Sequence, residues 1–119
     1  MVSKYVYDLE DRTLELAKRI SRLCRFLSKD IVNTEYIKQI IRSGSSVGAN
    51  YREANEALGK KDFLFRLKIS RKECKETIYW VELIIESNQH LEERIKPLLS
   101  ECIEIRNILS KIILNIENK

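Results

Sequence analysis

The chain has 119 residues, a length that fits one domain with a single core, and it contains only one proline and three glycines. Lys and Arg number 22 against 18 Asp and Glu, and a net charge of +4 is too small by itself to argue for nucleic acid. With 44% hydrophobic residues and no apolar run long enough to cross a bilayer, the composition favours a globular all-α protein and excludes a membrane-spanning one.

The N-terminal sequence and the number and spacing of the cysteines indicate the cellular compartment of the protein. No apolar stretch follows a basic segment at the start of the chain, so we expect no signal peptide. The three cysteines are an odd number without CxxC spacing, which is typical of a reducing interior. The sequence therefore predicts a cytoplasmic protein that contacts no membrane.

The first predicted helix covers residues 8–28. Its apolar residues recur at three- and four-residue steps, which is the pattern of an amphipathic helix. Acidic residues open it and basic residues close it, the order that complements the helix dipole. Its basic stripe (Lys18, Arg22, Arg25 and Lys29) is interpreted as structural, because Glu92 and Glu93 are expected nearby. Asn33 or Thr34 is expected to cap the next helix.

The second predicted helix runs through "SGSSVGAN", residues 43–50. Apolar positions keep helical register through Gly44 and Gly48, and no strand precedes them as a phosphate-binding loop requires. Each glycine costs about 1 kcal/mol relative to alanine inside a helix. Close approach of a neighbouring helix would offset that cost. We therefore predict that both glycines are buried against another helix; the alternative is an exposed, frayed helix.

The opposite side of this helix is predicted to face a neighbouring subunit. It combines small residues with two polar groups, Asn50 and Glu53, that are suited to directional hydrogen bonds across an interface. The predicted interface residues on this helix are Ser46, Ala49, Asn50 and Glu53.

The remaining chain predicts two more helices. Gly59 is expected to end the second helix, and the third begins near Lys61 and stops at the Ser87-Asn88 break. Pro97 is expected in the first turn of the fourth helix, where its missing N–H costs nothing. Four amphipathic helices with short connections predict an antiparallel up-down-up-down four-helix bundle that makes one domain of residues 1–119.

The sequence offers little for catalysis. The lone histidine, His90, lies in a polar break, and each cysteine falls on a core stripe. No Glu-x-x-His pair is present, and the carboxylate pairs Glu73/Glu76 and Glu101/Glu104 are interpreted as solvated helix faces. We therefore expect no enzyme, no catalytic residue, no metal and no cofactor.

Basic residues gather at the start of the third helix. Residues 60–75 hold seven Lys and Arg against two acidic residues, a net charge of +5. Cations at a helix N-terminus oppose the dipole, so helix stability does not explain the arrangement. Either a polyanion binds there, or acidic groups neutralise it within or between subunits. The start of the first helix supplies such groups: Asp8, Glu10, Asp11 and Glu15. The remaining alternative is a solvated helix face without a ligand. A stripe of roughly 60° opposite the core contains Lys61, Lys68, Lys72, Lys75 and Tyr79, with Phe65 at its edge.

The third helix also carries apolar residues away from both the core and the lysines. These are Ile69, Trp80 and Ile84, and together with the smooth face of the second helix they exceed what a small monomer exposes. We therefore predict an oligomer that uses Ile69 and Trp80; the alternative is that Trp80 folds over its own bundle.

The segment "RSGSSVGANYREANEALGKKDFLFRLKISRKECKETIYWVELI" resembles the small bacterial four-helix bundle proteins grouped with the 23S ribosomal RNA intervening-sequence proteins. In that family the second helix commonly reads small-Ile-Pro-Ala-Asn-x-Ala-Glu-Gly. Here Val47, Ala49, Asn50 and Glu53 fit that pattern. The departures are Gly48 for proline, Arg52 for alanine and Ala54 for glycine, which indicates a subgroup.

The resemblance implies a homopentameric ring of bundles with basic surfaces and no established enzymatic activity. It also implies kinship with accessory proteins of diversity-generating retroelements, which bind nucleic acid and partner with a reverse transcriptase. Our first hypothesis is thus a non-enzymatic RNA-binding protein whose stripe lysines contact phosphates while Tyr79 or Phe65 stacks on a base. The alternative is a structural or adaptor ring that docks another protein.

Overall fold

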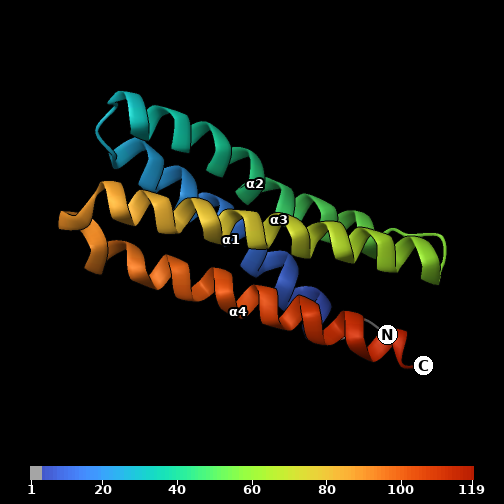
Figure 1. Cartoon of the computed structure of the whole chain (residues 1–119). Coiled ribbons are helices and arrows are strands. Elements are labelled where there is room, and N and C mark those ends of the chain that lie inside the picture. The colour runs from blue at the N-terminus through green and yellow to red at the C-terminus, as the bar shows by residue number, and fades with distance from the viewer. Residues whose placement is uncertain (1–3) are drawn as a thin grey trace.

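The computed structural model describes residues 4–119, with side chains from residue 9 onward. Its elements are α1 (Lys4–Phe26), α2 (Ile31–Asn55), α3 (Lys60–Ser87), the short 3-10 helix η1 (Gln89–Leu91) and α4 (Glu92–Glu117). The four long helices run alternately up and down in a body of 47 × 22 × 21 Å (Figure 1). The predicted all-α four-helix bundle is confirmed.

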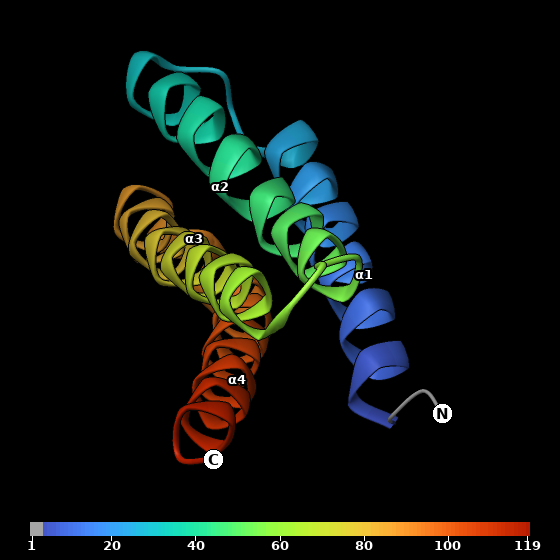
Figure 2. The same cartoon turned by 90° about the vertical axis from the view of Figure 1, so that its right-hand side faces the viewer.

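The helices do not pack equally against one another. α3 lies between α2 and α4, while α1 packs mainly on α2 and contacts α4 less. In the view along the bundle, the N-terminal part of α1 and the C-terminal part of α4 lie apart (Figure 2). The core runs along the centre and includes Leu16, Ile40, Leu67 and Ile105, each fully buried.

The two glycines of α2 lie mid-helix where α1 comes closest. Both are buried. A Cβ on Gly48 would lie 2.9 Å from Thr13 Oγ1 and 3.1 Å from Thr13 Cβ, and a Cβ on Gly44 would meet Ile20 Cδ1. Their lack of a side chain is thus what lets α1 approach this closely.

The start of α2 differs from the prediction. Asp30 caps it, because Asp30 Oδ1 accepts a hydrogen bond from the backbone N–H of Asn33 at 2.8 Å. Neither Asn33 nor Thr34 is the cap, and the expectation was wrong because Ile31 and Val32, exposed in the first turn, show no amphipathic pattern. Asn33 is instead buried, and its amide pairs reciprocally with Asn88 at 3.0 and 2.9 Å, which ties α2 to the end of α3.

Two further helix boundaries were predicted incorrectly. α2 ends at Asn55, and Gly59 takes the N-cap position of α3 in an extended conformation with φ 174°. α4 begins at Glu92, so Pro97 lies beyond its first turn. The helix tolerates this proline because the carbonyl left without a donor, that of Glu93, belongs to an exposed residue near the helix start.

Candidate nucleic-acid interface and subunit surface

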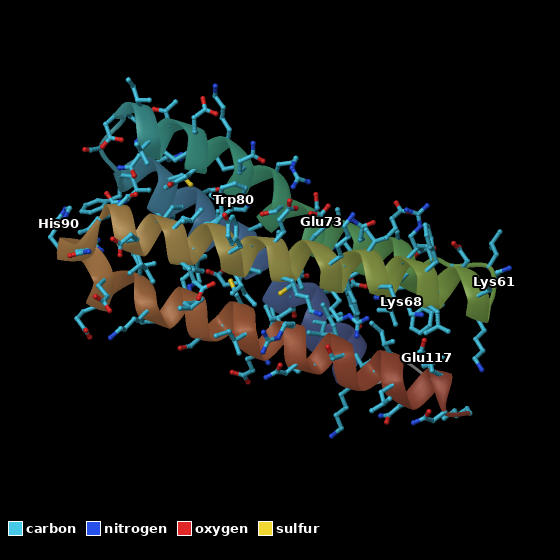
Figure 3. The ribbon with its side chains drawn as sticks, in the orientation of Figure 1. Lys61, Lys68, Glu73, Trp80, His90 and Glu117 are labelled. Carbon is cyan, nitrogen blue, oxygen red and sulfur yellow. The ribbon has the colours of Figure 1, made fainter. Side chains whose placement is uncertain are left out.

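The predicted basic residues share the outer face of α3. Lys61, Lys68, Lys72, Lys75 and Tyr79, hereafter the lysine stripe, are all exposed. Their spacing of three, four and seven residues returns each to nearly the same angle on the helix. Figure 3 places Lys61 at the α2–α3 end of the bundle, far from His90 at the other end.

One lysine of the stripe is neutralised within the chain. Lys68 Nζ lies 2.7 Å from Glu117 Oε2, at the C-terminal end of α4 (Figure 3). The hydrogen bond and charge of Lys68 lower the pKa of Glu117. Both side chains are more than 40% exposed, so this ion pair contributes little to folding stability.

Among the side chains that the structure describes, the acidic start of α1 does not neutralise the lysine stripe of its own chain. Glu10 accepts a hydrogen bond from Asn55 Nδ2 at 2.8 Å, and Glu15 pairs with Arg22 at 3.2 Å. Asp8, also expected there, lies outside the described side chains. The expectation failed for these two residues because α1 packs on α2 and not on the outer face of α3.

Three lysines therefore keep their charge available. Among the side chains that are described, no carboxylate lies within 4.0 Å of the ammonium group of Lys61, Lys72 or Lys75. Lys72 acts only at longer range, where its charge helps to lower the pKa of Glu76. The lysine stripe thus presents three charges to solvent.

Aromatic rings accompany these charges. Tyr79 is 55% exposed, and its ring meets Trp80 edge-on with centroids 5.1 Å apart. Phe65 is 58% exposed, with the Arg66 guanidinium 5.8 Å from its ring centroid. Each ring keeps open surface on which a flat group could stack.

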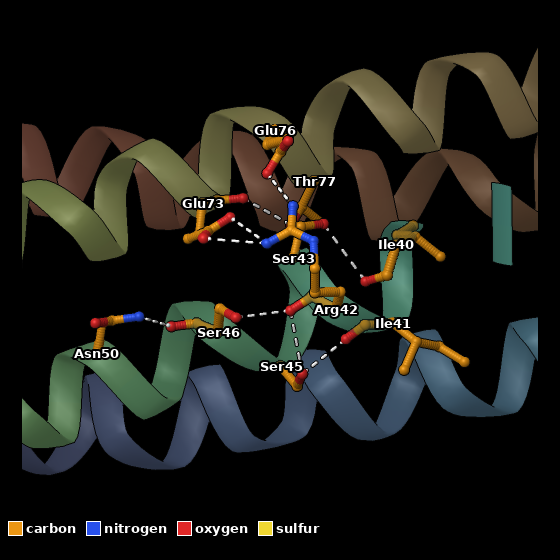
Figure 4. A network of polar contacts seen from close by, with 10 residues as sticks. All are labelled: Ile40, Ile41, Arg42, Ser43, Ser45, Ser46, Asn50, Glu73, Glu76 and Thr77. Atoms are coloured by element: carbon orange, nitrogen blue, oxygen red, sulfur yellow. Dashed lines mark hydrogen bonds and ion pairs between the residues drawn. The ribbon is translucent and has the colours of Figure 1, made fainter. Parts of the chain in front are cut away.

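The carboxylates Glu73 and Glu76 do not form a solvated face. Arg42 of α2 reaches across to α3, with Nη1 3.3 Å from both Glu73 oxygens and Nη2 against Glu76 (Figure 4). Burial raises the pKa of Glu73, whereas hydrogen bonds with Glu73 and Arg42 lower the pKa of Glu76. The sequence prediction was wrong because the arginine that binds the pair comes from another helix.

The second carboxylate pair is bound in the same way. Arg12 of α1 contacts Glu101 of α4 through Nη2 at 2.7 Å and Nε at 3.1 Å, and its Nη2 lies 3.3 Å from Glu104. The hydrogen bond that Arg12 donates to Glu101 raises the pKa of Arg12. These contacts join α1 to α4, the neighbouring helices with the least contact, and they replace the solvated face expected from the sequence.

The predicted subunit-facing residues of α2 lie beside α3 and on the adjoining surface. Ser46 Oγ donates to Arg42 O at 2.7 Å, and Asn50 Nδ2 donates to Ser46 O at 2.9 Å, so both polar groups bond within their own helix (Figure 4). Both residues are half-buried. Ala49 and Glu53 are exposed and remain available to a partner.

The predicted apolar flank of α3 is smaller than expected. Ile84 is fully buried, and Ile69 is half-buried. Trp80 is half-buried, and its ring lies 5.9 Å from Tyr36 of α2. The expectation for Ile84 was wrong because α3 packs against both α2 and α4, which widens its buried face beyond one stripe.

The other potentially reactive side chains are three buried cysteines and one exposed histidine. Burial raises the pKa of Cys24 to about 11 and those of Cys74 and Cys102 to about 12. His90 lies exposed in η1. Within the described part of the chain, no three His, Cys, Asp or Glu residues are placed to hold a metal ion, and no helix has the length and apolarity to cross a membrane.

One pocket was not predicted from the sequence. A pocket of about 220 Å³ lies between α1 and α4 and is bordered by Arg19, Arg22 and Arg94. Its apolar wall includes Phe26 and Ile95. Arg22 was assigned to the basic stripe of the first helix, but that it lines a pocket together with Arg94 was not predicted, because the two residues come from separate helices.

Comparison with known proteins settles the family. The family model for the 23S rRNA-intervening sequence protein matches residues 7–111. The chain belongs to this family. A crystal structure of a protein with unknown function from the S23 ribosomal protein family of Bacteroides thetaiotaomicron VPI-5482 is 41% identical, with a TM-score of 0.80. The match covers 88% of this chain and 97% of that one. No curated protein matches the chain.

Proposed function

We propose that this member of the 23S rRNA-intervening sequence protein family is a cytoplasmic, non-enzymatic oligomer that binds structured RNA through the lysine stripe. The observation that carries the proposal is the set of three exposed lysines without a carboxylate partner beside an exposed Tyr79. Three cations on one helix face, with Lys61 in the first turn of α3 and Lys72 and Lys75 near its middle, form an arrangement that favours a polyanion.

The chemistry of the lysine stripe suits a backbone contact. Lysine ammonium groups neutralise phosphates and release counterions, which gives affinity that falls steeply with salt. Such contacts do not read sequence, so recognition would follow the shape of the RNA. Tyr79 or Phe65 could stack on an unpaired base. A ring of subunits, such as a pentamer, would repeat the lysine stripe, and weak contacts would then add up.

The family to which the chain belongs supports this proposal. Its name refers to the intervening sequence of 23S rRNA, and the similar crystal structure is described as a protein of unknown function. A structured RNA is accordingly the first ligand to test, and a reverse transcriptase is the protein partner that family kinship suggests.

The experiment is a binding titration with structured RNA at two salt concentrations. We expect binding at low salt, and we expect the triple variant Lys61→Gln/Lys72→Gln/Lys75→Gln to flatten the salt dependence by about one unit of slope per lost phosphate contact. Lys18→Gln is the matched control, because Lys18 is exposed on α1, away from α3. Binding that is insensitive to salt, or absent at low salt, would contradict the proposal.

A second candidate is an adaptor ring in which the lysine stripe makes salt bridges with a partner or a neighbouring subunit. The Lys68–Glu117 ion pair favours it, because one stripe lysine already pairs with a carboxylate. The double variant Lys68→Glu/Lys72→Glu separates the two. Loss of the oligomer would identify an assembly surface, whereas an intact oligomer that no longer binds RNA supports the first proposal.

A further inference from the structure

The pocket between α1 and α4 is a second place where cations meet apolar surface. It lies where α1 ends and α4 begins, at the opposite end of the bundle from Lys61 and Glu117 (Figures 1 and 3). From its lining we infer that it binds a nucleoside monophosphate, in which a phosphate monoester is joined through ribose to a flat base. This inference does not depend on RNA binding by the lysine stripe.

The charge of the pocket is largely unbalanced. Arg22 pairs with Glu15 at 3.2 Å, but both of these side chains are more than half exposed. For Arg19 and Arg94, no carboxylate among the described side chains lies within ion-pair distance. Glu92 and Glu93, the acids at the start of α4, both contact Lys96 on their own helix. Two arginines therefore line the pocket without a carboxylate at ion-pair distance among the described side chains.

Glu92 and Glu93 pair with Lys96, so the expectation that they would neutralise the basic stripe of α1 was wrong. Lys29, in the same stripe, donates to the carbonyls of Cys24 and Leu27 at the end of α1. Its role is therefore structural, as predicted. The arginines beside the pocket differ from Lys29, because they satisfy no carbonyl of a helix end.

The apolar part of the pocket suits a ring. Phe26 is 54% exposed, and the Arg94 guanidinium lies 4.2 Å from its ring centroid. Ile95 and Leu98 contribute aliphatic surface from α4. A stacked guanidinium and phenyl ring hold each other in place, and both present flat surfaces against which a base can lie.

Volume and charge together narrow the ligand. The pocket of about 220 Å³ is smaller than the roughly 300–1,000 Å³ of sites that enclose a drug-sized ligand, so it favours a single nucleotide over a longer ligand. A phosphate monoester carries about −1.5 to −2 charges at neutral pH, which matches two unpaired guanidinium groups better than a carboxylate does. Guanidinium groups also bind phosphate oxygens in a bidentate way.

A calorimetric titration of the full chain tests the inference. The probes are adenosine monophosphate, inorganic phosphate and adenosine. Because phosphate and ring are both recognised, we expect the monophosphate to bind at least about tenfold more tightly than either fragment. Equal binding of inorganic phosphate would mean an unspecific anion site and would overturn the inference, as would the absence of saturable binding.

Variants show whether the pocket is responsible. Arg94→Gln and Arg19→Gln should each weaken binding of the monophosphate at least about tenfold. Phe26→Leu should weaken binding of the monophosphate more than binding of inorganic phosphate. Arg25→Gln is the control, since Arg25 is exposed on the same helix but does not line the pocket. The triple lysine variant should bind the monophosphate normally. An Arg94→Gln protein that binds as the parent does, with an unchanged circular dichroism spectrum, refutes the assignment.

The phosphate and base could belong to a free mononucleotide or to the 5′ end of an RNA strand, and a second experiment distinguishes these two ligands. Short oligoribonucleotides with a 5′-phosphate or a 5′-hydroxyl group provide the comparison. Tighter binding of the phosphorylated strand, removed by Arg94→Gln, identifies a strand end. Equal binding of the two strands, together with binding of adenosine monophosphate, identifies a free nucleotide.

Discussion

α2 makes two close contacts of different kinds. Toward α1 it presents Gly44 and Gly48, and the contact is one of shape, with Thr13 and Ile20 filling the space above the glycines. Toward α3 it presents a backbone carbonyl and a hydroxyl: Val47 O accepts from Ser70 Oγ at 2.7 Å, and Ser43 Oγ lies 2.9 Å from Thr77 Oγ1.

The difference teaches what each contact tolerates. A contact made by the absence of side chains is lost when volume is added, because a packed interior has no space to spare. A contact made by buried hydrogen bonds is lost when one partner is removed and the other is left unsatisfied. The α1–α2 contact should thus be sensitive to size, and the α2–α3 contact to polarity.

Adding volume at Gly48 should have the largest effect. We expect Gly48→Leu to destabilise the protein by about 1–3 kcal/mol or more, because the new side chain collides with Thr13. Gly48→Ala should cost less than Gly48→Leu but more than Gly44→Ala, since the atom that Gly44 faces is the mobile end of Ile20. Thermal melts of the three variants give the order.

The control for this series is Gly59→Ala. Nothing lies within 4 Å of a Cβ at Gly59, and its φ of 174° suits any residue. Its stability should therefore stay within about 0.5 kcal/mol of the parent. If Gly48→Leu melted like Gly59→Ala, the glycines would not be a packing contact.

Removing the buried amide of Asn88 should come next. Asn88 is 4% exposed and exchanges two hydrogen bonds with Asn33, and its Nδ2 also lies 2.8 Å from Ile84 O. Asn88→Ala leaves the Asn33 amide buried without this partner, which should cost about 1–3 kcal/mol. Chemical denaturation measures it, with His90→Ala, an exposed neighbour, as the control. A loss of stability equal to that of the control would show that the Asn33–Asn88 amide pair does not stabilise the fold.

The sequence was sufficient for the fold because each helix carries its own periodic pattern. Continuity of α2 through Gly44 and Gly48 followed from register alone. Helix ends were harder, since caps such as Asp30 depend on local geometry and not on periodicity. Proline was misleading for a related reason: Pro97 is tolerated beyond the first turn of α4, so it does not mark where that helix starts.

The candidate sites were only partly predictable. The exposure of the lysine stripe could be predicted from helix geometry, because all residues of one helix face lie within one segment of the sequence. The partners of charged groups do not, because Arg42 and Glu73, or Lys68 and Glu117, come from separate helices whose relative register no local pattern specifies. The pocket at Arg19 and Arg94 was missed for the same reason.

Removing the hydroxyl of Ser70 should have a moderate effect. Ser70 is fully buried, and its hydroxyl donates to Val47 O. This carbonyl lies within α2, so the bond from Ser70 is additional to its backbone hydrogen bond in the helix. We therefore expect Ser70→Ala to cost about 0.5–1.5 kcal/mol. Ser45→Ala is the matched control, because Ser45 is exposed and bonds only to carbonyls of its own helix. Urea titrations that show equal stability for the two variants would mean that the α2–α3 contact does not depend on this hydrogen bond.

The smallest expected effect is a change in pH dependence when Arg42 is replaced. Burial raises the pKa of Glu73 above that of the unfolded chain, and the positive charge of Arg42 opposes this rise. In Arg42→Gln the pKa of Glu73 should rise further. A carboxyl group whose folded pKa is raised favours the folded state while it is protonated, and this contribution is lost as the pH increases through the folded pKa. The variant should therefore lose more stability than the parent between mildly acidic and neutral pH. Melting curves across that range test this, with Arg22→Gln, which breaks the exposed pair with Glu15, as the control. Parallel pH profiles for Arg42→Gln and the parent would show that Arg42 does not stabilise the charged form of Glu73.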